Sequence, residues 1–244
     1  MQSTSFQAKI WQKLIKFDKE NKFFKTKQNV LVALSGGADS VALLHFTCAL
    51  AKKMQFKVYA CHVNHNLRPT AKRDENLVIN LCKELNVPLI VKKVAVKTLA
   101  KKEKLSLEHA ARKLRYQALE EAAKKFNCKV LAFAHHADDN VETFLLNLLR
   151  GTQLKGLGGI PAARPLGELK IIRPFLCLTK QEILEYCAYH NLPYENDETN
   201  FDDIYTRNFI RLNLLPMLEK KQPQIRKHIL NLCKQVQDIF KDNL

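Results

Sequence analysis

The stretch VLVALSGGADS, residues 30–40, decides the fold of this chain. Its first five residues, 30–34, form a short apolar run with β-branched valines, which is typical of a parallel strand buried on both faces. Gly36 and Gly37 follow where the strand ends, and because they lack side chains, backbone N–H groups there can approach an anion closely. Asp39 then opens an apolar pattern of helical period, so the positive end of a helix dipole faces the loop. The stretch predicts a nucleotide site at the end of a buried strand.

Two common nucleotide motifs are absent from the sequence. It contains neither G-x-x-x-x-G-K-[ST] nor G-x-G-x-x-G, which argues against a Walker NTPase and against a dinucleotide-binding fold. The segment SGGADS instead resembles the PP-loop of the ATP pyrophosphatases, enzymes that use ATP to adenylate a carbonyl oxygen and release pyrophosphate. An ordinary strand-to-helix turn is the alternative interpretation of so short a motif. The resemblance implies that ATP phosphates are held by Ser35, Gly36, Gly37, Ala38, Asp39 and Ser40.

The charge balance favours a polyanionic partner. The 244 residues include 40 Lys and Arg against 24 Asp and Glu, a formal net charge of +16. Such a surplus favours association with nucleic acid, although a lysine-rich genome composition would produce it too. No apolar stretch reaches the length of a membrane span, and the amphipathic N-terminus lacks a signal-peptide cleavage site. We therefore expect a cytoplasmic protein without a membrane partner.

The seven cysteines are expected to be free thiols. They stand at positions 48, 61, 82, 128, 177, 187 and 233, and no two of them have C-x-x-C spacing. Their number is odd, and most of them lie inside apolar patterns. This distribution predicts buried thiols in a reducing compartment and disfavours zinc and iron–sulfur sites.

Alternating strand and helix patterns predict the fold class. Strands are expected at residues 30–34, 57–63, 88–96, 129–134 and 170–175. The segments between them have helical patterns, for example residues 71–86, and a further helix is expected at residues 6–16. This alternation is typical of an α/β fold with a doubly wound, parallel, five-stranded sheet. We divide the chain into an N-terminal helix and connection, a PP-loop ATP-binding catalytic domain and a small helical C-terminal extension, at residues 1–27, 28–190 and 191–244.

The second half of the chain is expected to contain a long loop and several helices. Residues 151–168 hold five of the seven glycines, which predicts a flexible loop that acts as a lid or substrate-binding element. Thr179 and Glu182 have the spacing of a capping box, which marks the start of a helix. The pattern further predicts a helix that starts at Arg207 and breaks near Pro216, followed by an amphipathic helix over the last 20 residues.

Two charged clusters are candidates for the site. Arg112 and Arg115 lie three residues apart on a predicted helix, where they would either clamp phosphates or form a solvated basic face. The second cluster follows the fourth strand, and its acidic members have capping of the next helix as an alternative role. If the first and fourth strands are neighbours, this cluster faces the SGGADS loop, and carboxylates beside a triphosphate need Mg²⁺ between them. The second cluster comprises His135, Asp138, Asp139 and Glu142.

Further motifs extend the resemblance to nearly the whole chain. The segments HVNHNLR, SLEHAARKLRY, AHHADDNVET with LLRG, and DETNFDDIYTRNFIRLNLLPML accompany SGGADS over roughly residues 27–220. Their order and spacing are similar to those of the tRNA(Ile)-lysidine synthetase family. The resemblance implies an enzyme that uses ATP to adenylate the 2-keto oxygen of the wobble cytidine in a tRNA(Ile) with a CAU anticodon. The ε-amine of free L-lysine then displaces AMP and forms lysidine.

The resemblance also implies roles for the charged residues. Asp39 and Asp139 would hold Mg²⁺, and Arg112 and Arg115 would neutralise the departing pyrophosphate, with Arg115 favoured. Asp139 and Glu142 would orient the ammonium group of lysine, and one of these carboxylates would take its proton. The remaining candidates, for contacts with the nucleotide, the target base or the tRNA, are His135, Asp138, Arg207 and Arg211.

The sequence departs from the family pattern near its end. Many members continue into further C-terminal domains that grip the tRNA body, whereas this sequence reaches Leu244 soon after the segment LLPML. We therefore expect a short form that recognises its tRNA mainly with the catalytic domain and the final helices, and no protein partner is implied. Asn140 also stands where glutamine is the more common residue.

Three alternatives to lysine transfer are open at the level of sequence. Another PP-loop tRNA enzyme that inserts sulfur at cytidine would normally need paired cysteines, which this chain lacks. A synthetase that amidates a small molecule would not require a net charge of +16. A basic RNA-binding protein that keeps the nucleotide fold without turnover would not depend on the acidic cluster.

Overall fold

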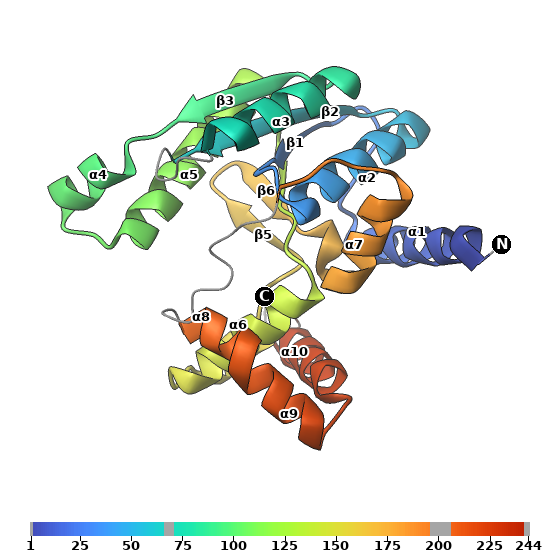
Figure 1. The fold of residues 1–244 in the computed structure, drawn as a ribbon, viewed down its shortest axis with the longest axis vertical. Coiled ribbons are helices and arrows are strands. Elements are labelled where there is room, and N and C mark those ends of the chain that lie inside the picture. The colour runs from blue at the N-terminus through green and yellow to red at the C-terminus, as the bar shows by residue number, and fades with distance from the viewer. Residues whose placement is uncertain (1, 66–70, 196–205, 242–244) are drawn as a thin grey trace.

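The computed structural model describes residues 2–65, 71–195 and 206–241, which form an α/β fold around a mixed sheet (Figure 1). The six strands lie in the order β3-β2-β1-β4-β6-β5, and all neighbouring pairs except β5 and β6 are parallel. The strands are β1 (Asn29–Ala33), β2 (Lys57–Asn64), β3 (Leu89–Lys93), β4 (Val130–Ala132), β5 (Ala163–Leu166) and β6 (Leu169–Ile172). The predicted fold class, a doubly wound parallel sheet, is confirmed.

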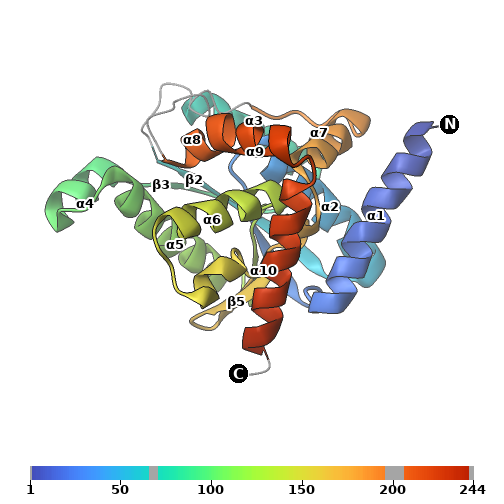
Figure 2. The ribbon, with the colours of Figure 1, turned by 90° about the horizontal axis from the view of Figure 1, so that it is seen from below.

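Alternate residues of β1 point to opposite faces of the sheet. Val30 and Val32 belong to a core with helices α1 (Gln2–Asn21), α2 (Ala38–Met54), α3 (Ala71–Glu84) and α7 (Lys180–Tyr189). Leu31 belongs to a second core, on the face covered by α5 (Leu107–Lys125). In Figure 2 α1 and α2 lie on one side of the molecule and α5 on the other. All three side chains are fully buried, which explains why β1 is a continuous apolar run.

The sixth strand corrects two predictions about residues 151–168. This segment was expected to be a flexible loop, and five strands were expected in the sheet. The structure instead contains the short helix η1 (Leu154–Gly158) and the antiparallel edge strand β5, which pairs with β6 through a turn at Gly167. Pro165 lies in β5, and an edge strand tolerates a proline because its missing N–H can face away from the sheet. The short sequence ARPL shows no alternation that would have indicated a strand.

Two segments differ from the expected boundaries. The predicted third strand at residues 88–96 ends at Lys93, and the chain then forms a helix that was not predicted, α4 (Val96–Glu103). α4 packs against α5 in a small core around Val96 and Ala110 (Figure 1). The N-terminal helix α1 extends beyond the expected 6–16, and Asp18 near its end accepts hydrogen bonds from the backbone N–H groups of Phe23 and Phe24, both at 3.1 Å.

The remaining helices form a separate layer beyond the carboxyl edge of the sheet (Figure 1). They are α6 (Ala137–Leu149), α8 (Thr206–Phe209), η4 (Ile210–Leu214), α9 (Leu215–Lys221) and α10 (Ile225–Lys241). Their shared core includes Phe144 from α6, Ile210 from η4 and Cys233 from α10. The predicted capping box of Thr179 and Glu182 and the amphipathic last helix are both present. The polar composition of residues 193–208 predicts an irregular segment, which is wrong for residues 206–208 because they belong to α8, while residues 196–205 lie outside the described residues.

The expected break near Pro216 is wrong. The chain remains helical from Thr206 to Lys221, because one wide π turn, η4, precedes the proline. In a regular α-helix the proline ring clashes with the carbonyl group four residues earlier and removes a hydrogen bond. The i→i+5 bond from Leu215 N–H to the Ile210 carbonyl shows the wider turn that accommodates the proline.

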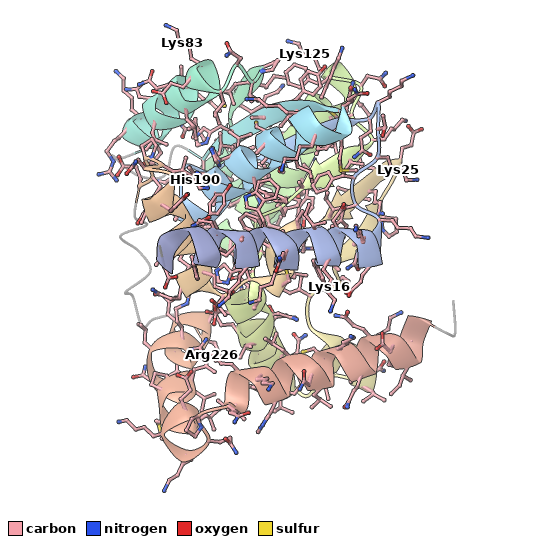
Figure 3. All side chains as sticks on the ribbon, turned by 90° about the vertical axis from the view of Figure 1, so that its right-hand side faces the viewer. Lys16, Lys25, Lys83, Lys125, His190 and Arg226 are labelled. Carbon is pink, nitrogen blue, oxygen red and sulfur yellow. The ribbon has the colours of Figure 1, made fainter. Side chains whose placement is uncertain are left out.

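The distribution of charge agrees with a surface that is basic on several sides. Lys16, Lys25, Lys83 and Lys125 come from different parts of the chain and are all exposed (Figure 3). Among the helices of the described residues, none combines the length and the apolar character that a membrane crossing requires.

Candidate functional site

The candidate site lies at the point where the strand order reverses. β1 and β4 are parallel neighbours, with Val30, Leu31 and Val32 paired to Val130, Leu131 and Ala132. β2 and β3 continue the sheet on one side of this pair, and β6 and β5 continue it on the other. Ligands of open parallel sheets bind at this switch point, outside the carboxyl ends of the strands. The loops after β1 and β4 therefore face the same space, because the two strands are neighbours, the condition that the sequence left open.

The SGGADS loop is built around the hydroxyl of Ser40. Its Oγ accepts hydrogen bonds from the backbone N–H groups of Ser35 at 3.1 Å and Gly36 at 3.2 Å, and donates one to the Gly37 carbonyl at 3.0 Å. Gly36 has φ +98, a conformation that L side chains rarely adopt. Gly37 precedes α2 without a side-chain cap, so the positive end of the helix dipole is open to a ligand. This arrangement suits an anion such as a phosphate.

His136 lies between the aspartates of the two loops. Its Nε2 is 3.9 Å from Oδ2 of Asp39 and 3.5 Å from Oδ2 of Asp139, and the imidazole is buried. His136 also caps α6: its Nδ1 accepts from the Asp139 N–H at 3.4 Å, and Oδ2 of Asp139 accepts from the His136 N–H at 3.0 Å. The capping role that the sequence left open for the acidic cluster therefore applies to Asp139. Capping leaves its second carboxylate oxygen available for another ligand.

Two basic residues from distant elements, Lys180 and Arg226, contact Asp39 and Asp138. Lys180, at the start of α7, places its Nζ 2.6 Å from Oδ1 of Asp39, and its backbone N–H donates to Asp138 at 2.7 Å. Arg226, near the start of α10 (Figure 3), donates to Oδ1 of Asp138 at 2.5 Å. It also donates to Glu219 at 2.6 Å. These contacts tie the carboxyl edge of the sheet to the C-terminal helices.

Glu142 pairs with the arginines predicted from the C-terminal segment. Its carboxylate accepts two hydrogen bonds from Arg211, at 2.6 Å and 3.0 Å, which is the bidentate arrangement of a strong ion pair. Arg207 donates to Thr143 at 3.0 Å, and its Nε lies 3.8 Å from Glu142. Only 2% of the Glu142 side chain is exposed, and its hydrogen bonds raise the pKa of the Arg211 guanidinium despite the burial of that group.

His135 is a buried histidine whose pKa is affected by several arginines. Burial lowers its pKa to about 4, the charge of Asp139 opposes that shift, and Arg173, Arg115 and Arg207 reinforce it. Burial, together with the charge of Arg112, also lowers the pKa of Arg115, against the influence of Tyr116. Arg115 is thus near enough to His135 to affect its pKa, and the guanidinium groups of Arg112 and Arg115 both lie over the ring of Tyr116.

The buried imidazole of His135 predicts a pH dependence of stability. Its pKa is about 4 in the folded protein against an ordinary value of 6.5, so protons bind more tightly to the unfolded chain between these values. Stability that is present above pH 6.5 should be lost as the pH falls toward 4. Replacing His135 by Gln should reduce this loss by roughly 2 kcal/mol, measured by urea unfolding at pH 7 and pH 4.5. An unchanged pH dependence in the variant would show that His135 is not the group responsible.

Several residues of the site were missed at the level of sequence. Lys180, Arg226 and His136 contact the predicted aspartates, and Arg164 and Arg173 come from the segment that was taken for a loop and the strand after it. Lys180 carried one usable signal, because it directly follows the predicted cap Thr179 and therefore opens a helix. The pairing of Arg226 with Asp138 spans 88 residues and has no local signal.

The acidic residues can be tested for their fit to a divalent cation. Asp39 and Asp139 converge on the same imidazole from different loops, so both carboxylates border one space. Within the described residues, no group of three or more His, Cys, Asp or Glu could hold a metal ion by itself. Two carboxylates that border one space fit Mg²⁺, which is usually bound through one or two carboxylates together with water and substrate phosphates.

The cysteines are free in the structure, and five of the seven are buried. Burial raises the pKa of Cys61 to about 12 and that of Cys187, behind the SGGADS loop, to about 11, with Asp39 contributing to the second shift. Reactive thiols need a depressed pKa, because the thiolate is the nucleophile and the metal ligand. These environments do not suit sulfur-transfer chemistry.

Comparison with known proteins identifies the family. The PP-loop domain family matches residues 4–218. A tRNA(Ile)-lysidine synthase of Clostridium perfringens is 44% identical over 209 residues, which cover 85% of this chain and 44% of the relative. A tRNA(Ile)-lysidine synthase of Petrotoga mobilis is 38% identical over 222 residues, covering 91% of this chain and 70% of the relative. The chain thus spans less than half the length of the first of these relatives.

A solved structure supports the fold independently of sequence. The U34-tRNA thiolase NcsA from Methanococcus maripaludis, with its [4Fe-4S] cluster, has a TM-score of 0.77 at 18% identity, covering 93% of this chain and 78% of that chain. At this identity the likeness speaks for the fold alone. The family match and the synthase relatives show that the chain belongs to the PP-loop family and, within it, to the tRNA(Ile)-lysidine synthases.

Proposed function

We propose that this protein joins free L-lysine to C2 of the wobble cytidine of a tRNA(Ile) with a CAU anticodon, using ATP and releasing AMP and pyrophosphate. One observation carries the proposal: the SGGADS loop and the carboxylates of Asp138, Asp139 and Glu142 lie at the same switch point of the sheet. The chain in which they lie belongs to the PP-loop family. The net charge of +16 supports a polyanionic substrate such as tRNA.

The first step activates the base. The 2-keto oxygen of cytidine attacks the α-phosphorus of ATP, a P–O bond forms, and pyrophosphate leaves with the electron pair of the broken P–O bond. Backbone N–H groups at the start of α2, in residues 38–40, would hold the phosphates. Ser40 would shape the loop, because its Oγ accepts from the N–H groups of Ser35 and Gly36. Lys180 lies within reach of the same space and would neutralise charge there, with Arg115 as the second candidate. Asp39 and Asp139 would hold Mg²⁺, which supplies further neutralisation of the phosphates.

The second step uses the acidic cluster. The ε-ammonium of lysine loses a proton to a carboxylate, the amine attacks C2 of the cytidine, and AMP leaves. Asp139 is the candidate for orienting and deprotonating the amine, because it faces the loop and has an oxygen that capping does not use. Glu142, held by Arg211, would help Asp139 to orient the ammonium group. His135, neutral above its pKa of about 4, would lie against the base or the nucleotide without adding charge, and Arg207 would contact tRNA.

The direct test is lysine incorporation. The purified protein is incubated with ATP, labelled lysine and a tRNA(Ile) transcript bearing CAU, and label is followed in the RNA together with the release of AMP. The same transcript with a UAU anticodon serves as a control, because it has a uridine in place of the wobble cytidine. Failure of a folded protein that binds both ATP and tRNA to incorporate label would contradict the proposal.

The loop makes a separate prediction about ATP. Gly36→Ala would force a side chain onto a residue with φ +98, and should weaken ATP binding about tenfold by turning the loop N–H groups away. Gly167→Ala is the matched control, since that glycine has φ +54 with no atom near the added methyl group and lies in the β5–β6 turn. Equilibrium binding of ATP measures both variants. Equal affinities would mean that the loop geometry is not used for ATP.

A further inference from the structure

Four arginines gather around one tyrosine beside the switch point. Arg112 and Arg115 come from α5, Arg164 from β5, and their guanidinium carbons lie 5.3, 6.0 and 5.6 Å from the centre of the Tyr116 ring. Arg164 also donates to the Tyr116 hydroxyl at 3.1 Å. Arg173, which follows β6, lies beside Arg164 in the sheet, because its backbone N–H donates to the carbonyl of Ala162 at 2.9 Å, and Tyr116 affects its pKa. Both β6 and β5 lie on the β4 side of the switch point.

The positive charge of this cluster is not balanced. Across residues 2–65, 71–195 and 206–241, none of the four arginines forms an ion pair with a carboxylate, and Nε of both Arg115 and Arg173 is buried without a hydrogen-bond partner. Arg173 is only 4% exposed and keeps one hydrogen bond, to the Pro161 carbonyl at 2.6 Å. An unpaired buried guanidinium costs free energy unless another group compensates it.

The pKa values of Arg173 and Tyr116 reflect the closeness of the four arginines. The pKa of Arg173 is lowered to about 10, mainly by burial and also by the charges of Arg164 and Arg112, although Tyr116 acts to raise it. Burial alone would raise the pKa of the Tyr116 hydroxyl, but the hydrogen bond from Arg164 and the charges of Arg112 and Arg115 lower it overall. Like charges are thus held together by the fold, which is typical of sites prepared for a ligand of opposite charge.

We propose that Arg112, Arg115, Arg164 and Arg173 form a phosphate-binding subsite, with Tyr116 as the residue that positions them. Guanidinium groups bind phosphate oxygens in a forked geometry, and several guanidinium groups around one aromatic ring can surround one phosphate. The inference rests on the proposed function, because two phosphate sources then exist: the RNA backbone beside the target cytidine and the polyphosphate of ATP. β6 is the second strand from β1, about 10 Å across the sheet, which favours the RNA backbone.

The test uses Arg164→Gln in the full chain, with Lys113→Gln as the matched control. Lys113 lies on the same helix as Arg112 and is paired with Glu103 on the surface, so its replacement removes the same charge outside the cluster. Binding of the tRNA(Ile) transcript is measured against salt without ATP or lysine, and binding of inorganic pyrophosphate is measured in parallel. Arg164→Gln should weaken one of them about tenfold, and Lys113→Gln should not.

The two measurements distinguish the phosphate sources. Weaker RNA binding, with a salt slope smaller by about one, identifies the RNA backbone. Weaker pyrophosphate binding with unchanged RNA binding identifies the polyphosphate. If Arg164→Gln behaves like Lys113→Gln with both ligands, the subsite is refuted. Neither binding measurement needs lysine. A failure of lysine transfer in the unaltered protein would therefore contradict the proposed function and leave the conclusion about the phosphate-binding subsite unchanged.

Thermal unfolding separates binding from a structural role. Removing one of several unpaired like charges should leave the melting temperature of the ligand-free protein unchanged or raise it. Pyrophosphate should then stabilise the unaltered protein more than Arg164→Gln if the polyphosphate is the source. A lower melting temperature of Arg164→Gln with unchanged ligand binding would assign the cluster to folding and overturn the proposal. Tyr116→Phe, which keeps the ring but removes the acceptor for Arg164, should reproduce part of the binding loss.

Discussion

Exchange of Asp139 for asparagine is expected to slow lysine transfer by about a thousandfold while binding of tRNA(Ile) is retained. Asparagine has nearly the shape of aspartate and can still accept the hydrogen bond from the His136 N–H, so the start of α6 should remain capped. It carries no negative charge and cannot take a proton from the incoming ammonium group. Single-turnover transfer of labelled lysine measures the rate, and filter binding measures the tRNA affinity.

Glu182→Gln is the matched control for this variant. Glu182 occupies the third helical position of the α7 capping box, the position that Asp139 has in α6, and its carboxylate accepts from the Thr179 N–H at 2.9 Å. Its replacement removes the same charge from an equivalent helix start, but at a residue without a proposed role in the reaction. It should transfer lysine at close to the normal rate. Parallel loss of transfer and of tRNA binding in Asp139→Asn would point to a folding role for Asp139.

The sequence predicts the centre of the fold well because its signal is local. The apolar run before Gly36 and the alternation of strands and helices are enough to predict a parallel sheet, and adjacency of β1 and β4 follows from the usual winding of such sheets. The strand β5 could not be predicted in the same way. Its four residues contain a proline, and they become a strand only because β6 offers an unpaired edge.

The candidate site shows the same division between local and distant information. Asp138 and Asp139 stand out in sequence because they follow a strand and open a helix. Asp138 accepts hydrogen bonds from Lys180 in α7 and from Arg226 in α10. Nothing in the sequence of either helix indicates which carboxylate its basic residue contacts. Arg164 was missed for a further reason, since it lies in the segment that was interpreted as a flexible loop. Long-range pairing of charges therefore needs the structure.

The pair of Glu142 and Arg211 predicts an unequal response to mutation. Arg211→Met removes the bidentate partner of a carboxylate that is 2% exposed, and among the described residues leaves it the Nε of Arg207 at 3.8 Å. This variant should lower the free energy of unfolding by about 3 kcal/mol. Glu142→Gln leaves a guanidinium that is 35% exposed and can turn toward water, so its cost should be nearer 1 kcal/mol. Urea unfolding measures both variants, and the opposite order would contradict this account of the pair.

Two further variants separate stability from function at this position. Lys129→Met breaks an ion pair whose side chains are 67% and 86% exposed, and should change stability by less than about 0.5 kcal/mol. The double variant Glu142→Leu with Arg211→Met removes both charges, and should recover much of the stability that Arg211→Met alone loses, because no buried charge remains. It should nevertheless fail to transfer lysine. Recovery of stability without recovery of transfer would mean that the charged pair of Glu142 and Arg211 is retained for the reaction, since an apolar pair supports the fold as well.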